Sequence, residues 1–119
     1  MRRALALAAL LALAATPGCG SGLNLPVTGR HADDEEPVSV PTPPPPGKVE
    51  IIAKPPANLK DPVWIDGEMD WTGRRWQWRE GRWEVPPPDS YYAPPATVRR
   101  ADGSLAHYKG AWKKGKPKK

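Results

Sequence analysis

Apolar and polar residues alternate along residues 63–83, and this alternation is the strongest structural signal in the chain. The segment holds five of the six tryptophans, although the chain contains no phenylalanine. Met69 and Trp71 precede a short polar segment, and Trp76 and Trp78 follow it with the same spacing of two. A period of two on both sides of a turn predicts a β-hairpin with half-buried strands.

The turn of this hairpin decides which residues pair across its strands. We expect either a two-residue loop at 73–74, with glycine first as a type II′ turn requires, or a four-residue loop at 72–75. Both loops set Trp71 opposite Trp76 and bring all four apolar side chains onto one face. A slip of one residue would place an arginine opposite Trp71 and break up this face.

The other face of the hairpin is predicted to carry cross-strand ion pairs. Glu68 lies opposite Arg79, and Arg75 lies diagonal to Asp70. Exposed pairs of this kind contribute only about 0.2–1 kcal/mol each, so a solvated face is the simplest interpretation. As an alternative, Asp66, Glu68 and Asp70 could form a row of oxygen ligands for Ca²⁺, although a strand separates alternate side chains by about 6–7 Å.

Part of this pattern recurs further along the chain. Three positions match at offsets of 28, 29 and 29 residues: Trp64 with Tyr92, Gly81 with Gly110, and Trp83 with Trp112. Such spacing predicts a diverged internal repeat and a second hairpin, closed by a three-residue loop at 101–103. We expect this second hairpin to lean on the first, because its inward positions hold Thr97, Arg99, Leu105 and His107.

We therefore predict an all-β fold, a small antiparallel sheet of two tryptophan-rich hairpins within residues 48–112. The hairpins are expected near residues 68–79 and 96–108, and a β-prone run at residues 48–54 can add an edge strand. The side chains expected to form an aromatic core or a stacking face are Trp64, Met69, Trp71, Trp76, Trp78, Trp83 and Trp112.

Residues 1–18 have the pattern of a secretory signal peptide. Their apolar run of twelve residues is shorter than the roughly 20 that a membrane-spanning helix needs. Cys19, the only cysteine, resembles the lipobox cysteine of bacterial lipoproteins, which becomes the lipid-bearing first residue, although Thr16 replaces the usual leucine. The alternative is ordinary cleavage near Ala14, which leaves a free thiol. In either case the chain is exported, and one cysteine forms no internal disulfide.

Two segments are expected to be disordered. Residues 19–47 contain an acidic block and a proline run, so we predict a stiff tether that lifts the domain off a membrane. Residues 20–98 hold 8 basic and 12 acidic residues, whereas residues 99–119 hold 8 basic residues and 1 acidic residue. The tail at 113–119 is therefore expected to contact an anionic surface, with solubilising charge as the alternative. Its lysines are Lys113, Lys114, Lys116, Lys118 and Lys119.

The sequence offers little for catalysis. His31 lies in the predicted tether, and His107 occupies a tryptophan position of the repeat, where a stacked ring is the better interpretation than a general base. We find no histidine pair at metal-ligand spacing, no glycine-rich phosphate loop and no nucleophile-elbow motif. The expectation is a protein without catalytic residues, cofactor or metal.

Residues 78–83 form a full W-x-x-G-x-W motif. On this motif the chain resembles the WXXGXW (YXWGXW) repeat proteins, a group found largely among exported bacterial proteins, often with proline-rich flanks. The resemblance spans roughly residues 63–112, and its other copies are partial. It implies a repeat architecture and an envelope location, and it supplies no catalytic residues because the group has no agreed activity.

These expectations lead to two functional hypotheses. The first is a non-enzymatic lipoprotein of the bacterial cell envelope, in the outer membrane or facing the periplasm. It would be held by a lipid on Cys19, and its basic C-terminus would contact an anionic glycolipid or polysaccharide rather than nucleic acid. The second is a carbohydrate-binding module that stacks sugars on exposed tryptophan rings. The two differ in whether the tryptophans face inward or outward.

Overall fold

The computed structural model describes residues 23–117, so the predicted signal peptide, Cys19, Lys118 and Lys119 lie outside the described residues. Within this range the chain forms strands and no helix, which confirms the all-β prediction. Accordingly, no helix that could cross a membrane occurs in the described part of the chain. The strands are β1 (Val38–Val40), β2 (Val63–Ile65), β3 (Glu68–Trp71), β4 (Trp76–Arg79), β5 (Arg82–Glu84), β6 (Ser90–Ala93), β7 (Ala96–Arg99), β8 (Leu105–Tyr108) and β9 (Ala111–Lys114).

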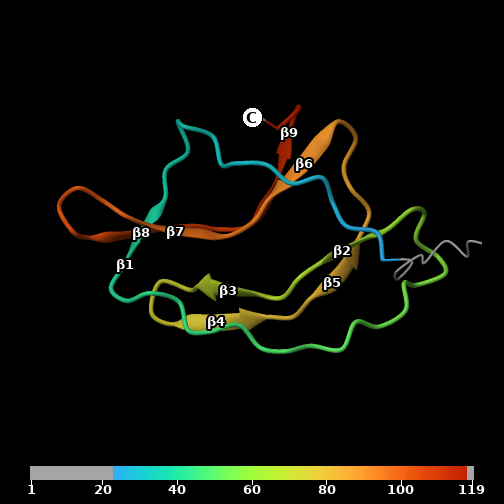
Figure 1. The fold of residues 1–119 in the computed structure, drawn as a ribbon, viewed down its shortest axis with the longest axis horizontal. Coiled ribbons are helices and arrows are strands. Elements are labelled where there is room, and N and C mark those ends of the chain that lie inside the picture. The colour runs from blue at the N-terminus through green and yellow to red at the C-terminus, as the bar shows by residue number, and fades with distance from the viewer. Residues whose placement is uncertain (1–22, 118–119) are drawn as a thin grey trace, which may run out of the picture.

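Two long antiparallel hairpins make up most of the fold (Figure 1). In the first hairpin β2 pairs with β5 and β3 pairs with β4, and in the second β6 pairs with β9 and β7 pairs with β8. A short break between the strands bends each hairpin midway. The predicted single sheet is therefore divided into shorter ladders, of which β1-β8-β7 has three strands.

The first hairpin has the predicted register. Its four cross-strand pairs are Glu68 with Arg79, Met69 with Trp78, Asp70 with Gln77, and Trp71 with Trp76. The backbone N–H of Thr72 donates to the carbonyl of Arg75 at 3.0 Å, whereas the N–H of Arg75 donates to the Thr72 hydroxyl at 3.3 Å, so the loop keeps one of the two backbone bonds of a two-residue turn. Gly73 opens this loop with a φ of 99°, a conformation that glycine adopts without a steric penalty.

The second hairpin also pairs as predicted, with Thr97 opposite His107 and Arg99 opposite Leu105. Its loop is the expected three-residue one, because the N–H of Arg100 donates to the carbonyl of Ser104 at 2.8 Å. The glycine that ends this loop, at position 103, has a φ of 87°. The additional loop residue accounts for the change of repeat offset between the two halves of the hairpin.

The outer strand pairs confirm the alignment of the two hairpins. Trp64 pairs with Trp83 in the first, and Tyr92 pairs with Trp112 at the equivalent place in the second. The ring centroids lie 5.5 Å apart at 67° in the first pair and 5.3 Å apart at 65° in the second. This edge-to-face geometry is favourable for aromatic rings, so both hairpins use the same packing at the same position.

Glycine is required at the bends because aromatic rings lie directly over the backbone there. A Cβ atom on Gly81 would collide with the ring of Trp64, and one on Gly67 would collide with the ring of Trp78. A Cβ atom on Gly110 would overlap the hydroxyl of Tyr92. The glycine of the W-x-x-G-x-W motif is thus explained by close packing of a ring on the partner strand.

The N-terminal segment, residues 23–42, differs from the predicted disordered tether, and we name it the N-terminal arm. Its strand β1 pairs with β8, where it covers an edge that would otherwise be open. Nearby, the N–H of Tyr92 donates to the carbonyl of Val27 at 2.8 Å, and the carbonyl of Tyr92 accepts from Gly29 at 3.1 Å. The predicted start of the folded domain, at residue 48, is therefore too late in the chain. The β-prone run that forms β1 is short, and the acidic residues and prolines on either side of it are typical of a disordered segment.

Residues 48–54 do not form the predicted edge strand. Both carboxylate oxygens of Glu50 accept from the N–H of Gly81, at 2.9 and 3.1 Å, and the carbonyl of Ala53 accepts from the indole of Trp83 at 2.8 Å. These contacts attach the segment through one side chain and one backbone carbonyl, and not through the regular backbone hydrogen bonds of a strand ladder. The segment therefore follows the first hairpin without joining its sheet.

The apolar core lies between the outer parts of the two hairpins. Val63 and Ile65 of β2 pack with Tyr92 of β6, and the partly buried Trp112 of β9 packs against this cluster. Ile65 is only 1% exposed. The core thus joins the two repeats, which agrees with the expectation that the second hairpin leans on the first.

Candidate functional site

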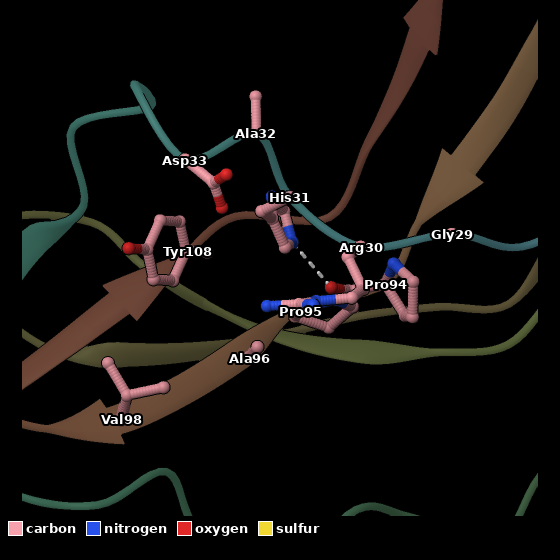
Figure 2. A pocket seen from close by; sticks show the side chains of 10 residues that line it. All are labelled: Gly29, Arg30, His31, Ala32, Asp33, Pro94, Pro95, Ala96, Val98 and Tyr108. Carbon is pink, nitrogen blue, oxygen red and sulfur yellow. Dashed lines mark hydrogen bonds between the residues drawn. The ribbon is translucent and has the colours of Figure 1, made fainter. Parts of the chain in front are cut away.

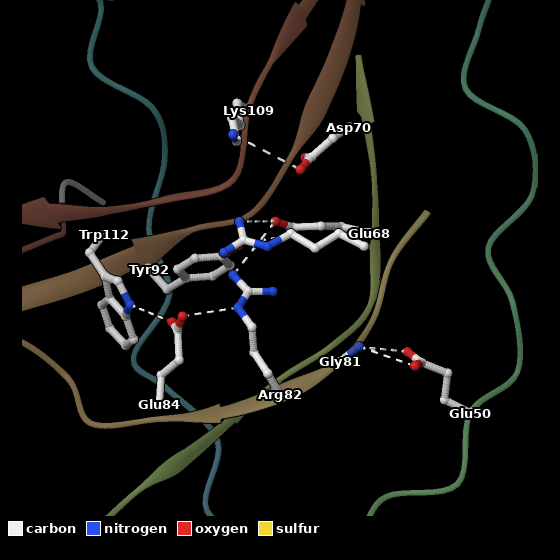
Figure 3. A network of polar contacts seen from close by, with 10 residues as sticks. Glu50, Glu68, Asp70, Gly81, Arg82, Glu84, Tyr92, Lys109 and Trp112 are labelled. Atoms are coloured by element: carbon white, nitrogen blue, oxygen red, sulfur yellow. Dashed lines mark hydrogen bonds and ion pairs between the residues drawn. The ribbon is translucent and has the colours of Figure 1, made fainter. Parts of the chain in front are cut away.

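A buried group of polar side chains crosses the interface between the two hairpins (Figure 3). We name it the polar seam, and its members are Glu68, Arg79, Arg82, Glu84, Tyr92 and Trp112. The first four come from the first hairpin and the last two from the second. The seam therefore connects the repeats through hydrogen bonds and ion pairs, next to the apolar core.

Glu68 is the central residue of the polar seam. Its side chain is only 3% exposed, and its Oε2 accepts a hydrogen bond from the Tyr92 hydroxyl at 2.6 Å. Guanidinium nitrogens of Arg79 and Arg82 lie 3.6 and 3.8 Å from its Oε1. The side chains of Arg79 and Arg82 are 40% and 21% exposed, so solvent screens both ion pairs and each contributes less than a fully buried pair would.

Glu84 forms the second link between the repeats. Its carboxylate accepts from Arg82 Nε at 2.9 Å and from the Trp112 indole at 2.8 Å. Burial raises the pKa of Glu84, but these two hydrogen bonds, together with the charges of Arg82 and Arg79, hold the pKa below its usual value. The carboxylate is therefore charged at neutral pH.

Tyr92 acts as a hydrogen-bond donor in the seam and is poorly suited to acid–base chemistry. Burial raises the pKa of its hydroxyl well above the usual value, and the adjacent Glu68 carboxylate raises it further. The phenol thus keeps its proton at any physiological pH. The mutual pairing of these groups makes the seam a structural link between the hairpins.

The row of carboxylates at positions 66, 68 and 70 does not form a calcium site. Asp66 accepts from the Trp64 indole at 2.8 Å, whereas Asp70 lies 4.0 Å from the ammonium of Lys109. Glu68 points into the polar seam, and within the described residues no three acidic, histidine or cysteine side chains gather for a metal. The predicted diagonal pair of Arg75 with Asp70 is also wrong, because Lys109 takes that place.

The predicted aromatic residues are all drawn toward the interior. Trp64 is 5% exposed, and the other five tryptophans and Met69 are partly buried. Trp76 packs edge-on against His107 of the second hairpin, with centroids 4.8 Å apart, and its indole donates to Thr42 at 3.2 Å. His107 therefore packs against the aromatic face as expected, but edge-on at 90° and not stacked.

A second polar cluster fastens the N-terminal arm to the second hairpin (Figure 2). His31 Nδ1 lies 2.9 Å from a Glu35 carboxylate oxygen, and His31 Nε2 lies 2.7 Å from the Pro94 carbonyl. Glu35 also pairs with Lys113 of β9 at 2.8 Å. Burial raises the pKa of Glu35, but the hydrogen bonds from Lys113 and His31 outweigh it and lower the pKa overall.

An open cavity of about 460 Å³ lies beside this polar cluster, between the arm and β7. In Figure 2 the ring of His31 points from the arm toward Pro94, and the ring of Tyr108 lies close to it. The His31 and Tyr108 ring centroids are 4.9 Å apart. Both nitrogens of His31 are engaged, but the lining also includes the charged side chains of Arg30 and Asp33.

The predicted basic tail begins inside a strand. Lys113 and Lys114 belong to β9, and Lys113 is neutralised by Glu35. Lys114 and Lys116 are exposed, and Lys118 and Lys119 lie outside the described residues. A hollow of about 470 Å³ adjoins Lys113 and Lys114, and its other lining residues are Pro87, Pro88, Asp89, Ser90 and Trp112.

Sequence reasoning missed most of the polar seam. Glu68 and Arg79 were expected to pair on a solvated face, because the register alone does not show that the second hairpin covers that face. Tyr92 was identified only as the repeat equivalent of Trp64, and nothing in the sequence indicated its bond to Glu68. No sequence pattern identified Glu84 as a member of such a group.

Comparison with known proteins finds no matching family model, no matching curated protein and no matching solved structure. The resemblance to WXXGXW repeat proteins therefore stays a prediction. In this structure the glycine of the motif, Gly81, is packed against the ring of Trp64.

Proposed function

We propose that this chain is a non-enzymatic, lipid-anchored protein of the bacterial cell envelope that contacts an anionic glycan through its basic C-terminus. In this proposal Cys19 carries the lipid and the chain is exported to the outer membrane or faces the periplasm. The two hairpins act as a rigid scaffold between the anchor and the contact surface. The component contacted is a glycolipid or polysaccharide that carries negative charge.

The observation that carries this proposal is the hollow at the end of β9. Its lining combines one partly buried ring, Trp112, and the exposed Lys114 with a single acid, Asp89. A ring face and a nearby cation suit an acidic sugar, whose apolar face packs on the ring while its charge meets the lysine. The pairing of Lys113 with Glu35 fixes the strand from which the other lysines extend.

The binding experiment compares the wild-type full chain with a tail-neutral chain, in which Lys114, Lys116, Lys118 and Lys119 are changed to glutamine. The wild type is expected to bind polygalacturonate, and binding should weaken steeply above about 0.15 M salt, where the screening length is about 8 Å. The tail-neutral chain should lose this binding. Glutamine at Lys48, Lys54 and Lys60 is the matched control and should have no effect, since these exposed lysines lie elsewhere.

Two further outcomes decide between the hypotheses. Salt-independent binding of a neutral polysaccharide that is lost in Trp83→Ala, but kept in the tail-neutral chain, would replace the proposal with a carbohydrate-stacking module. The lipid anchor is tested by fractionating cells that express the chain. Cys19→Ala should release the protein from the membrane fraction. A soluble wild-type chain that begins near Ala15 would contradict the lipid anchor.

A further inference from the structure

We propose a second binding surface, formed by the tips of the two hairpins, that recognises phosphate groups. Four arginines form this surface, which we name the arginine end: Arg74, Arg75, Arg99 and Arg100. The first two flank the β3–β4 turn and the last two lead into the β7–β8 loop. This inference goes beyond the proposed contact of the C-terminal tail and does not depend on it.

The two tips lie at the same end of the molecule. In Figure 1 both loops point to the left, and residue 23, where the described chain begins, lies at the opposite end. The N-terminal arm ties the tips together, since Ser39 accepts from Arg100 at 2.8 Å and Thr42 accepts from the Trp76 indole at 3.2 Å. Three residues of chain span at most about 11 Å, so these two attachment points are close neighbours.

The arginine end has a strong excess of positive charge. The segments that form it, residues 39–42, 72–75 and 99–104, contain four arginines and a single acid, Asp102. Hydrogen bonds from the side chain and backbone of Ser104 lower the pKa of Asp102, and they occupy one of its oxygens at 2.6 and 2.9 Å. No acid of the described chain forms an ion pair with any of the four arginines.

The guanidinium groups keep donors free for a ligand. Arg74 and Arg75 are exposed, and among the described residues their side chains donate no hydrogen bond. Arg99 and Arg100 each use one nitrogen, toward the Gly103 carbonyl at 2.7 Å and toward Ser39. A guanidinium has five N–H donors in a planar fork, so each arginine can still form a bidentate contact.

The backbone next to Arg75 is held in place before any ligand binds. Trp76, next to Arg75, packs edge-on against Trp71 at 5.3 Å and against His107 at 4.8 Å. A segment that is already ordered loses less conformational entropy when a ligand binds. Phosphate fits this surface, because the planar arginine fork forms bidentate pairs with phosphate oxygens and neighbouring phosphates of a polyanion can each meet a different arginine.

The arginine end and the C-terminal tail differ in the type of cationic residue that they carry. All cationic side chains at the tips are arginines, and all those of the tail are lysines. Arginine binds phosphate through a rigid fork, whereas lysine acts as a flexible point charge. We therefore expect the two surfaces to differ in ligand preference as well as in position.

The test uses the full tail-neutral chain, so that the tail does not contribute to binding. This chain should bind long-chain inorganic polyphosphate more tightly than polygalacturonate. Changing all four arginines to glutamine should weaken polyphosphate binding at least about tenfold, since four cations that attract the anionic polymer are lost. Changing all four to lysine keeps the charge and should still weaken binding several-fold, because the fork is lost.

Several outcomes would overturn the proposal. These are unchanged binding by the glutamine variant, equal binding of polygalacturonate by the tail-neutral chain, or full binding by the lysine variant. The double variant Arg74→Gln/Arg75→Gln guards against misfolding, because these side chains have no internal partner, and it should lose part of the affinity. Arginine-dependent binding to phosphatidylglycerol vesicles as well as polyphosphate would support lipid headgroups as a source, and binding to polyphosphate alone would support a soluble phosphorylated polymer.

Discussion

At the scale of single residues, burial decides the chemistry of this small protein. His107 is 3% exposed, its Nδ1 faces the Thr97 hydroxyl at 2.9 Å, and its ring packs edge-on against Trp76. Burial lowers the pKa of His107, the charge of His31 lowers it slightly more, and the carboxylate of Asp70 opposes the shift. The imidazole is therefore held neutral inside the fold, although it would gain a proton readily in water.

This shift predicts a loss of stability in mild acid. Below the usual pKa of 6.5, the unfolded chain binds a proton at His107 that the folded chain does not bind. Stability is therefore complete above about pH 7.5 and falls as the pH decreases toward about 5.5. The measurement is the free energy of unfolding against pH in a His31→Gln chain, compared with the same chain carrying His107→Gln as well.

The chain with both substitutions should show a clearly flatter profile in this range. Glu35 and Glu84 do not interfere, because their lowered pKa values lie below 4.5 and their contribution is lost only in stronger acid. Identical slopes for the two chains would show that His107 is not held neutral by the fold.

At the scale of elements, the first hairpin was predictable because three local signals agree. The period of two, the glycine in the turn and the paired tryptophans all favour one register, and a slip would cost the whole aromatic face. The second hairpin was predictable only through the repeat, since its own strands carry few large apolar residues. The loop at 101–103 was found because the repeat offset changes there.

The face assignment of the first hairpin gives the second prediction. Trp76 packs between Trp71 and His107, whereas Gln77, the next residue, is exposed. Trp76→Ala should lower the free energy of unfolding by about 2–4 kcal/mol, because it removes a partly buried ring. Gln77→Ala should change it by no more than about 0.5 kcal/mol. Denaturant unfolding of both variants measures this difference, and equal losses would contradict the assigned faces.

At the scale of the whole molecule, the fold has three parts: two bent hairpins and the N-terminal arm that contacts both of them. The polar seam joins the hairpins, and the arm covers β8 and binds β6. Neither feature follows from local pattern, because both depend on residues far apart in the chain. The arm is the clearest case, since its acidic and proline-rich composition is typical of a disordered segment.

The arm yields the last prediction, that residues 23–42 belong to the folded unit, which therefore does not begin at residue 48. A chain of residues 48–117 loses the backbone partners of Tyr92 and the strand that covers β8. Each lost hydrogen bond contributes about 0.5–1.5 kcal/mol. Because small domains have only about 5–15 kcal/mol of stability, this chain should melt far below a chain of residues 23–117 or fail to fold.

Point substitutions test the same claim without truncation. Val40 is 6% exposed where β1 meets β8, whereas Val38, two residues earlier on the same strand, is 51% exposed. Val40→Asp places a charge in a buried position and should lower the melting temperature strongly, while Val38→Asp should have little effect. Equal melting of the two truncated chains, together with equal effects of the two substitutions, would mean that the arm does not belong to the folded unit and that the hairpins are stable without it.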